Sequence, residues 1–222
     1  MPSSADTERA AAVPRSPALS EAAAGKYLII GLHGYGGQGS DIRTWLRMIR
    51  GEQTHFYTPC GPHESTLARK GFEWFPITSD VGRMRDRGSA VAHGIAKDIK
   101  ALQARLGIDA RHTAVVGFSQ GAIVASCLIG LVPACHFVLA NGRVLPAAAG
   151  PTADTHVLIL AGEHDTFAPV SQMRADLRSA CHPRITYELF EIPGAAHEMT
   201  DRGARVVARY LNVSLMNEQK AS

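Results

Sequence analysis

The segment from Thr113 to Val124 constrains this chain most, because it places Gly-x-Ser-x-Gly between two apolar runs of different character. The first run is rich in β-branched residues and predicts a strand, and the second predicts a buried helix. A strand can turn into a helix within about two residues only where small residues flank the turn, as Gly117 and Gly121 do here. We expect Ser119 to be strained with its hydroxyl exposed, beside free N–H groups at the start of the helix.

Strand-like and helix-like segments alternate through the rest of the chain. Strands are expected at residues 27–32, 54–57, 113–116, 136–140, 156–161 and 185–192. Helices are expected at residues 41–50, 89–106, 122–131, 170–181 and 200–211. This alternation predicts βαβ units, and therefore an α/β fold with a doubly wound, mostly parallel sheet. Ligands bind such sheets beyond the carboxyl ends of the strands, so residues that directly follow strands are candidates for a site.

A chain of 222 residues fits one domain with one core. Residues 1–24 are rich in Ala, Ser and Pro and lack the apolar core of a secretory signal, so we expect a disordered extension. The folded domain is expected over residues 25–213, followed by a C-terminal tail at 214–222. The absence of a targeting signal predicts a cytoplasmic location.

Composition argues against several partners. The net charge is only +3 and no basic run occurs, so nucleic acid is not expected as a partner. No apolar stretch is long enough to span a bilayer, so stable membrane insertion is not expected either. The cysteines are Cys60, Cys127, Cys135 and Cys181, and they lack the spacing of a metal site. Cys127 and Cys135 lie in apolar runs, which predicts buried thiols in a reducing compartment.

A serine hydroxyl needs a base to take its proton, and a histidine base needs a carboxylate to orient it. In α/β-hydrolases these groups follow the chain order Ser, Asp or Glu, His. Ser119, Asp165 and His197 meet that order, and each lies in a loop after a predicted strand. Glu163 stays open as an alternative acid, because it lies in the same loop as Asp165.

The choice among the ten histidines depends on their positions. His197 alone follows both the nucleophile and an acid in a loop after a strand. His182 follows a helix, which places it at the opposite edge of the sheet, and His164 is expected to be a loop residue. His33 lies in the turn after the first strand, where it is expected to hold the Gly-rich loop through hydrogen bonds.

A tetrahedral intermediate needs backbone donors. One is expected from the N–H of Gln120 and the other from the N–H of Tyr35, in the loop after the first strand. The spacing Gly34-x-Gly36-x-x-Gly39 also matches a dinucleotide-binding turn. Glu52 is the acid at the required distance, but it follows a predicted helix and is badly placed to reach a ribose.

With these residues placed, the chain resembles the phospholipase/carboxylesterase family of α/β-hydrolases, which includes acyl-protein thioesterases. The likeness runs from about Tyr27 to Leu211. The matching pieces are Leu32-His-Gly-Tyr-Gly-Gly-Gln-Gly-Ser-Asp41, Pro59-Cys-Gly-Pro62, Gly71-Phe-Glu-Trp-Phe75, Gly117-Phe-Ser-Gln-Gly121, Asn141-Gly142, Gly162-Glu-His-Asp165 and Gly194-Ala-Ala-His197.

The resemblance implies a compact α/β-hydrolase fold without a substantial lid, and catalysis without a metal or cofactor. It makes Ser119 the nucleophile, Asp165 the acid and His197 the base, with Tyr35 and Gln120 N–H groups as the oxyanion hole. It also makes Trp74 a wall of the acyl site, with a core aromatic as an equal alternative for this residue, and Phe75 is expected to line the same small pocket.

The expected substrate is a small carboxylic ester or thioester, cleaved through an acyl-serine intermediate. A small pocket and the few residues available for a cap, 143–154, predict short to medium acyl groups of about two to six carbons, because further methylenes would stay wet. A lysophospholipase or acyl-protein thioesterase acting on long chains is the alternative enzyme. A hydrolase-fold binding protein without turnover is the alternative from another class, and a homodimer stays open.

Overall fold

The structure is a computed structural model, and it describes residues 26–49, 53–66, 68, 70–146 and 150–216. The expected extension at residues 1–24 lies outside the described residues, as does the chain beyond residue 216. The last helix extends to Met216, three residues into the segment predicted to be a tail.

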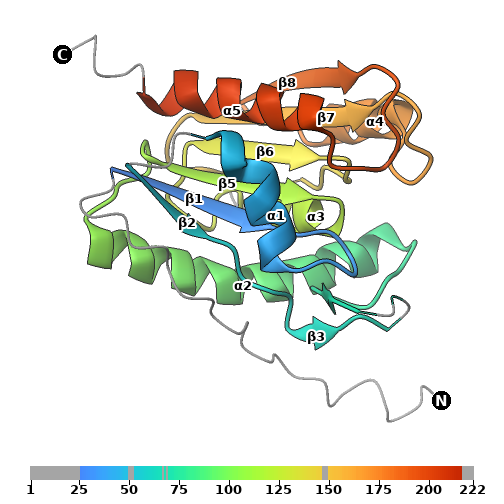
Figure 1. The fold of residues 1–222 in the computed structure, drawn as a ribbon, viewed down its shortest axis with the longest axis horizontal. Coiled ribbons are helices and arrows are strands. Elements are labelled where there is room, and N and C mark those ends of the chain that lie inside the picture. Colours follow the sequence, from blue (N-terminus) through green and yellow to red (C-terminus); the bar gives the residue numbers. More distant parts are fainter. Residues whose placement is uncertain (1–25, 50–52, 67, 69, 147–149, 217–222) are drawn as a thin grey trace.

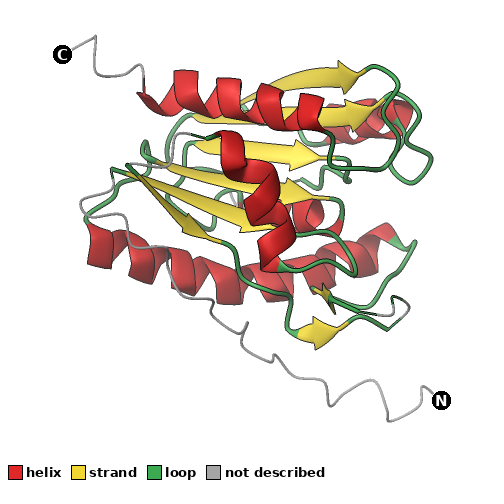
Figure 2. Ribbon diagram, viewed as in Figure 1, coloured by secondary structure: helices red, strands yellow, loops and turns green. Residues whose placement is uncertain are grey.

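A six-stranded sheet forms the centre of the molecule, with the strand order β2-β1-β5-β6-β7-β8 (Figure 2). All neighbouring strands in it pair in parallel. Its strands are β1 (Tyr27–Leu32), β2 (Thr54–Tyr57), β5 (Thr113–Phe118), β6 (His136–Ala140), β7 (Thr155–Gly162) and β8 (Ile185–Ile192). The predicted doubly wound α/β fold is therefore confirmed. Because every strand runs the same way, the loops after β1, β5, β6, β7 and β8 meet at one edge.

Helices cover both faces of this sheet (Figure 1). One face carries α1 (Gly39–Trp45), the short 3-10 helix η1 (Leu46–Met48) and α5 (Asp201–Met216). The other carries α2 (Val81–Leu106), α3 (Gln120–Leu128) and α4 (Val170–Ser179). The inner strands β1, β5, β6 and β7 are almost entirely buried, as expected for parallel strands covered by helices on both faces, whereas the edge strand β8 is partly exposed.

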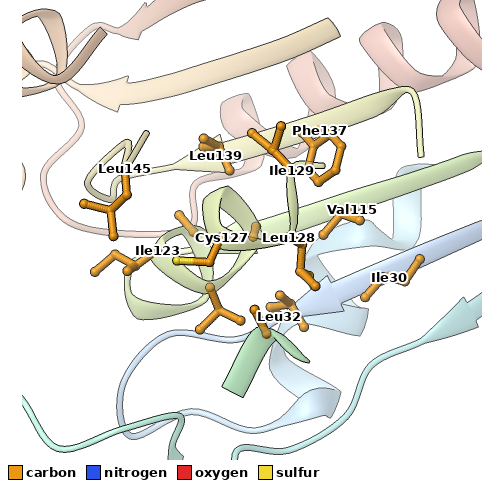
Figure 3. Close-up of a cluster of buried hydrophobic side chains, with 14 of the residues drawn as sticks. Ile30, Leu32, Val115, Ile123, Cys127, Leu128, Ile129, Phe137, Leu139 and Leu145 are labelled. Carbon is orange, nitrogen blue, oxygen red and sulfur yellow. The ribbon is translucent and has the colours of Figure 1, made fainter. Parts of the chain in front are cut away.

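Helix α3 lies inside the core, and all nine of its residues are buried. Figure 3 shows side chains of α3 in one apolar cluster with those of β1, β5 and β6. The labelled residues are Ile30, Leu32, Val115, Ile123, Cys127, Leu128, Ile129, Phe137, Leu139 and Leu145. Burial of Cys127 and Cys135 agrees with the sequence prediction. This packing fixes the N-terminal end of α3, which follows Ser119 directly.

The largest differences from the sequence prediction concern helix α2 and the loop after β2. Helix α2 begins at Val81, eight residues before the predicted start, with Asp80 as its N-cap. The Asp80 carboxylate accepts a hydrogen bond from Arg83 N at 2.8 Å. In addition, the loop expected after β2 contains a short antiparallel hairpin of β3 (His63–Glu64) and β4 (Phe72–Glu73). Gly36 N donates to Phe72 O at 2.9 Å, so the hairpin supports the Gly-rich loop after β1.

The connection between β6 and β7 contains no helix in its described residues, 141–146 and 150–154. Val144 and Leu145 are buried, and the Arg143 guanidinium fastens this segment to α4 through two 2.7 Å hydrogen bonds to Asp176. Residues 141–145 of this connection therefore pack onto the domain, whereas residues 150–154 are mostly exposed.

Candidate active site

Ser119 lies in the turn between β5 and α3, and its backbone is strained. Its φ of 53° and ψ of −116° are rare for a residue with a side chain. A Cβ on Gly117 would overlap the carbonyl of Gly121, and one on Gly121 would overlap the carbonyl of Leu32. Glycine is therefore needed on both sides of the serine, as the sequence predicted. The turn ends the strand with the Ser119 side chain at the carboxyl edge of the sheet.

The structure brings Ser119, His197 and Asp165 into one series of hydrogen bonds. Ser119 Oγ lies 2.8 Å from His197 Nε2, and His197 Nδ1 lies 2.8 Å from Asp165 Oδ2. An ionised carboxylate only accepts hydrogen bonds, so Nδ1 carries the proton and Nε2 accepts from the serine. The three residues follow β5, β8 and β7 respectively, which explains how positions 78 and 32 residues apart meet.

Asp165 is held ionised by its surroundings. Burial disfavours its charge, but hydrogen bonds from Ala168 N, His197 and Asn141, together with the charge of His197, outweigh that effect and lower its pKa. Oδ1 accepts from the backbone of Phe167 at 2.9 Å and of Ala168 at 2.8 Å. Since no part of this side chain is exposed, its orientation towards His197 is fixed.

Glu163, the alternative acid, has a different partner. Its carboxylate accepts a hydrogen bond from Gly194 N at 2.7 Å, and about half of its side chain is exposed. It therefore holds the loop after β8 rather than the histidine ring. His164 is exposed in the same loop, and His182 follows α4 at the other end of the sheet.

Asn141 is a site residue whose contacts the sequence did not reveal. It directly follows β6, and its Nδ2 donates to Asp165 Oδ2 at 2.8 Å and to Ala196 O at 3.1 Å. Its φ of 50° is positive, a conformation that asparagine tolerates better than most residues. Among the described residues, only Ser119 and Asn141 combine a side chain with positive φ. The amide thereby joins the loops after β6, β7 and β8.

The loop after β1 is fixed beside Ser119 by His33. Gly61 N donates to His33 Nε2 at 2.9 Å, so the proton lies on Nδ1, which donates to Gly34 O at 2.7 Å. Burial lowers the pKa of His33, opposed by Gly34 O and Asp41, which favours this neutral form. A Cβ on Gly34 would lie only 2.8 Å from the Phe118 ring and 3.3 Å from Ser119 Cβ, so the start of this loop lies against Ser119. The predicted structural role of His33 agrees with these contacts.

Trp74 and Phe75 occupy different positions from the predicted pocket wall. Trp74 has no exposed surface and Phe75 is 4% exposed, so neither offers an open face to a ligand. Trp74 Nε1 donates to His33 O at 2.8 Å, and the indole stacks on the His33 ring. The Gln120 side chain accepts from Trp74 N at 2.8 Å and donates to Phe75 O at 2.7 Å. The two aromatic residues therefore support the loop after β1 and the start of α3, which lie beside Ser119.

Two other aromatic rings flank His197. The Phe118 ring lies 5.4 Å from the imidazole and the Phe167 ring 5.2 Å, measured between centroids. Phe118 is half-buried, whereas Phe167 is 82% exposed. No pattern in the sequence indicates this arrangement, since Phe167 follows Asp165 in a loop without any periodicity.

Within the described residues, no three His, Cys, Asp or Glu side chains lie close enough to hold a metal ion. Nor does any described helix have the length and apolar character needed to cross a membrane.

Comparison with known proteins identifies the family and supports the fold. Residues 18–215 match the profile of the phospholipase/carboxylesterase family. Esterase PE8 superposes with a TM-score of 0.77 at 24% identity, over 91% of this chain and 99% of that one. SOBER1 from Arabidopsis thaliana gives 0.74 at 16% identity, over 85% and 99%. A carboxylesterase from Mesorhizobium loti gives 0.66 at 20% identity, over 84% and 88%. The family profile covers most of the chain, which therefore belongs to the phospholipase/carboxylesterase family of hydrolases.

Proposed function

We propose that this hydrolase cleaves carboxylic esters through an acyl-serine intermediate, with Ser119 as nucleophile, His197 as base and Asp165 as the orienting acid. The observation that carries the proposal is the hydrogen-bond series from Ser119 Oγ through His197 to Asp165, with both distances at 2.8 Å. A lowered pKa keeps Asp165 anionic near neutral pH, and an anion there stabilises the imidazolium that forms during reaction.

The reaction proceeds in two halves. His197 Nε2 takes the proton of Ser119 as Oγ attacks the carbonyl carbon, and the carbonyl oxygen becomes an oxyanion. The bond to the alcohol oxygen then breaks, and His197 returns the proton to the departing alcohol. Water attacks the acyl-serine by the same route, which releases the carboxylic acid and restores the serine hydroxyl.

The oxyanion is stabilised by the N–H groups of Gln120 and Tyr35. Gln120 is the first residue of α3, where backbone N–H groups have no partner inside the helix and the helix dipole favours negative charge. Tyr35 follows Gly34, whose close approach to Phe118 and Ser119 brings this loop next to the nucleophile. Trp74 and the Gln120 side chain fasten both loops to each other.

The proposed substrates have short to medium acyl groups, of about two to six carbons, because each methylene contributes about 0.8 kcal/mol only where water is excluded. Two features support this preference. Val144 and Leu145, in the connection after β6, are buried in the domain, and the Trp74 ring is buried in the core. These apolar side chains are therefore unavailable to line a long groove.

A series of 4-nitrophenyl esters from acetate to palmitate tests the proposal, with kcat/KM measured below the micelle threshold. We expect a maximum at about two to six acyl carbons and a decline beyond. A continuous rise through the long chains would assign the protein to the lysophospholipases or acyl-protein thioesterases instead. No turnover, combined with no labelling of Ser119 by a fluorophosphonate, would identify a binding protein.

A further inference from the structure

Phe167 is the one phenylalanine of this chain that lies in solvent. Its side chain is 82% exposed, whereas the other six phenylalanines are buried or half-buried. Single exposed apolar residues are common on protein surfaces and alone indicate nothing. The position of Phe167, two residues after Asp165 and against His197, gives its exposure a chemical meaning.

The loop holds the backbone that carries this ring in a fixed place. Phe167 N donates to Asp165 Oδ1 at 2.9 Å, and the next residue, Ala168, is 4% exposed and donates to the same oxygen at 2.8 Å. Pro169 then caps α4. Since the backbone on both sides of the ring is bound, Phe167 is part of the same rigid assembly that orients His197.

The ring lies beside the histidine that would handle the departing alcohol. Its centroid is 5.2 Å from that of His197, with 53° between the ring planes. In the proposed reaction the alcohol oxygen must come within hydrogen-bond reach of His197 Nε2 to receive the proton. The carbonyl oxygen faces the N–H of Gln120 at the same time, so the two ends of the ester lie in different directions from Ser119.

We infer that Phe167 binds the alcohol part of the substrate and selects esters of apolar, above all aromatic, alcohols. This inference rests on the proposed function and names one half of its substrate. An aromatic pair contributes enough beyond area burial to change kcat/KM by about tenfold. The Phe167 ring is exposed to solvent in the free enzyme. The free energy of this aromatic contact is therefore obtained only when a substrate covers the ring.

Acylation and deacylation distinguish binding of the alcohol by Phe167 from positioning of His197 by the same ring. The acyl-serine has already lost the alcohol, so Phe167 acts on its formation and has no alcohol to contact during its hydrolysis. A ring that merely kept His197 in place would affect both halves alike, because His197 serves in both.

The experiment compares acetate esters of ethanol, benzyl alcohol and 2-phenylethanol with ethyl esters of acetate, butyrate and hexanoate. Phe167→Ala removes the ring, Phe167→Tyr keeps it, and Val213→Ala truncates a 52% exposed side chain on α5. We expect Phe167→Ala to lower kcat/KM about tenfold for the two aromatic alcohols and less than threefold for ethyl acetate. Phe167→Tyr, which keeps the ring, should retain most of the preference for the aromatic alcohols, and Val213→Ala should match the wild type on every ester.

Deacylation is measured with one acyl group, as the rate that follows the initial burst of alcohol release. This rate should be the same in Phe167→Ala and in the wild type. An equal loss on all esters together with slower deacylation would show that the ring acts only through His197, and would overturn the inference. A loss graded with acyl length, or no loss, would overturn it too. If the wild type hydrolyses none of these esters, the proposed function fails first; if it hydrolyses them without discrimination by Phe167, only this inference fails.

Discussion

The two ends of the parallel sheet bury polar side chains in opposite ways. At the amino end, His136 of β6 and His156 of β7 stand side by side under Tyr210 of α5, and they line a partly open cavity of about 230 Å³. His136 Nδ1 and the Tyr210 hydroxyl are buried there without a hydrogen-bond partner among the described residues. At the carboxyl end, each Asp165 oxygen accepts two hydrogen bonds.

The difference follows from where the side chains are attached. His136 and His156 lie within strands, whose backbone groups are used in the sheet, so their rings find no backbone donors. Asp165 lies in a loop, where the N–H groups of Phe167 and Ala168 are available to it. Burial of ionisable groups is therefore common to both ends, whereas alignment with a nucleophile occurs at one.

Removing the nucleophile at the carboxyl end of the sheet should have the largest effect on activity. Ser119→Ala is expected to lower kcat by at least about a thousandfold, because histidine and acid cannot act without the hydroxyl. Steady-state ester hydrolysis measures the loss, and thermal unfolding checks the fold. A folded variant that keeps more than about a tenth of wild-type kcat would remove Ser119 from the mechanism.

The acid is the next most sensitive position. Asp165→Asn should lower kcat by about a thousandfold or more, because the amide no longer fixes the Nδ1–H tautomer of His197. Glu163→Gln is the matched control, since it neutralises a carboxylate in the same loop that contacts Gly194 instead. Steady-state kinetics on one ester compares them, and a larger loss in the Glu163 variant would transfer the role of acid to that residue.

Asn141 gives a smaller but more specific effect. Asn141→Gly removes the amide that joins Asp165 to Ala196. Because glycine adopts a φ of 50° without strain, we expect near-normal stability. A slightly misplaced acid should lower kcat/KM by about ten- to a hundredfold. Asn141→Asp keeps the size but sets a second carboxylate against Asp165, which should also shift the pH profile of kcat/KM.

Thermal unfolding and a pH series separate these effects. If activity in Asn141→Gly falls only in proportion to a lost folded fraction, the residue is structural and does not position the acid.

The sequence was sufficient for the sheet and for the grouping of Ser119, Asp165 and His197. Strands β1, β2, β6 and β8 match the predicted ranges residue for residue. Strands β1 and β6 are mostly continuous apolar runs, which are typical of buried parallel strands, whereas Thr186, Glu188 and Glu191 interrupt the apolar residues of β8. The three site residues could be grouped because parallel strands end at one edge, so chain order and loop position were enough.

The start of α2, the β3–β4 hairpin and the position of Trp74 depend on contacts that no sequence pattern shows. The first turns of α2 contain Gly82, Gly88 and several charges, with Met84 as the buried apolar residue, so helical periodicity is faint there. Strands of two residues, such as β3 and β4, have no period to detect. Trp74 was placed at the substrate because a core aromatic and a site aromatic look alike in sequence.

At the amino end of the sheet, we expect a change of pH to alter the free energy of unfolding alone. This is the smallest effect that we predict. Burial, with help from the charges of His156 and His112, lowers the pKa of His136 to about 4, from an ordinary value of 6.5. Between these values the unfolded chain binds a proton that the folded chain does not. The contribution of a neutral His136 is therefore complete above pH 6.5 and is lost as the pH falls towards 4.

A shift of this size would lower the free energy of unfolding by about 1 to 2 kcal/mol between pH 8 and pH 5. His136→Gln should remove that part of the pH dependence, while His93→Gln, at an exposed histidine of α2, should leave it unchanged. Urea unfolding of both variants and the wild type at pH 8, 6.5 and 5 measures it. Parallel curves for wild type and His136→Gln would mean that the folded protein binds the proton as readily as the unfolded chain, and the contrast between the two ends of the sheet would then rest on hydrogen bonding alone.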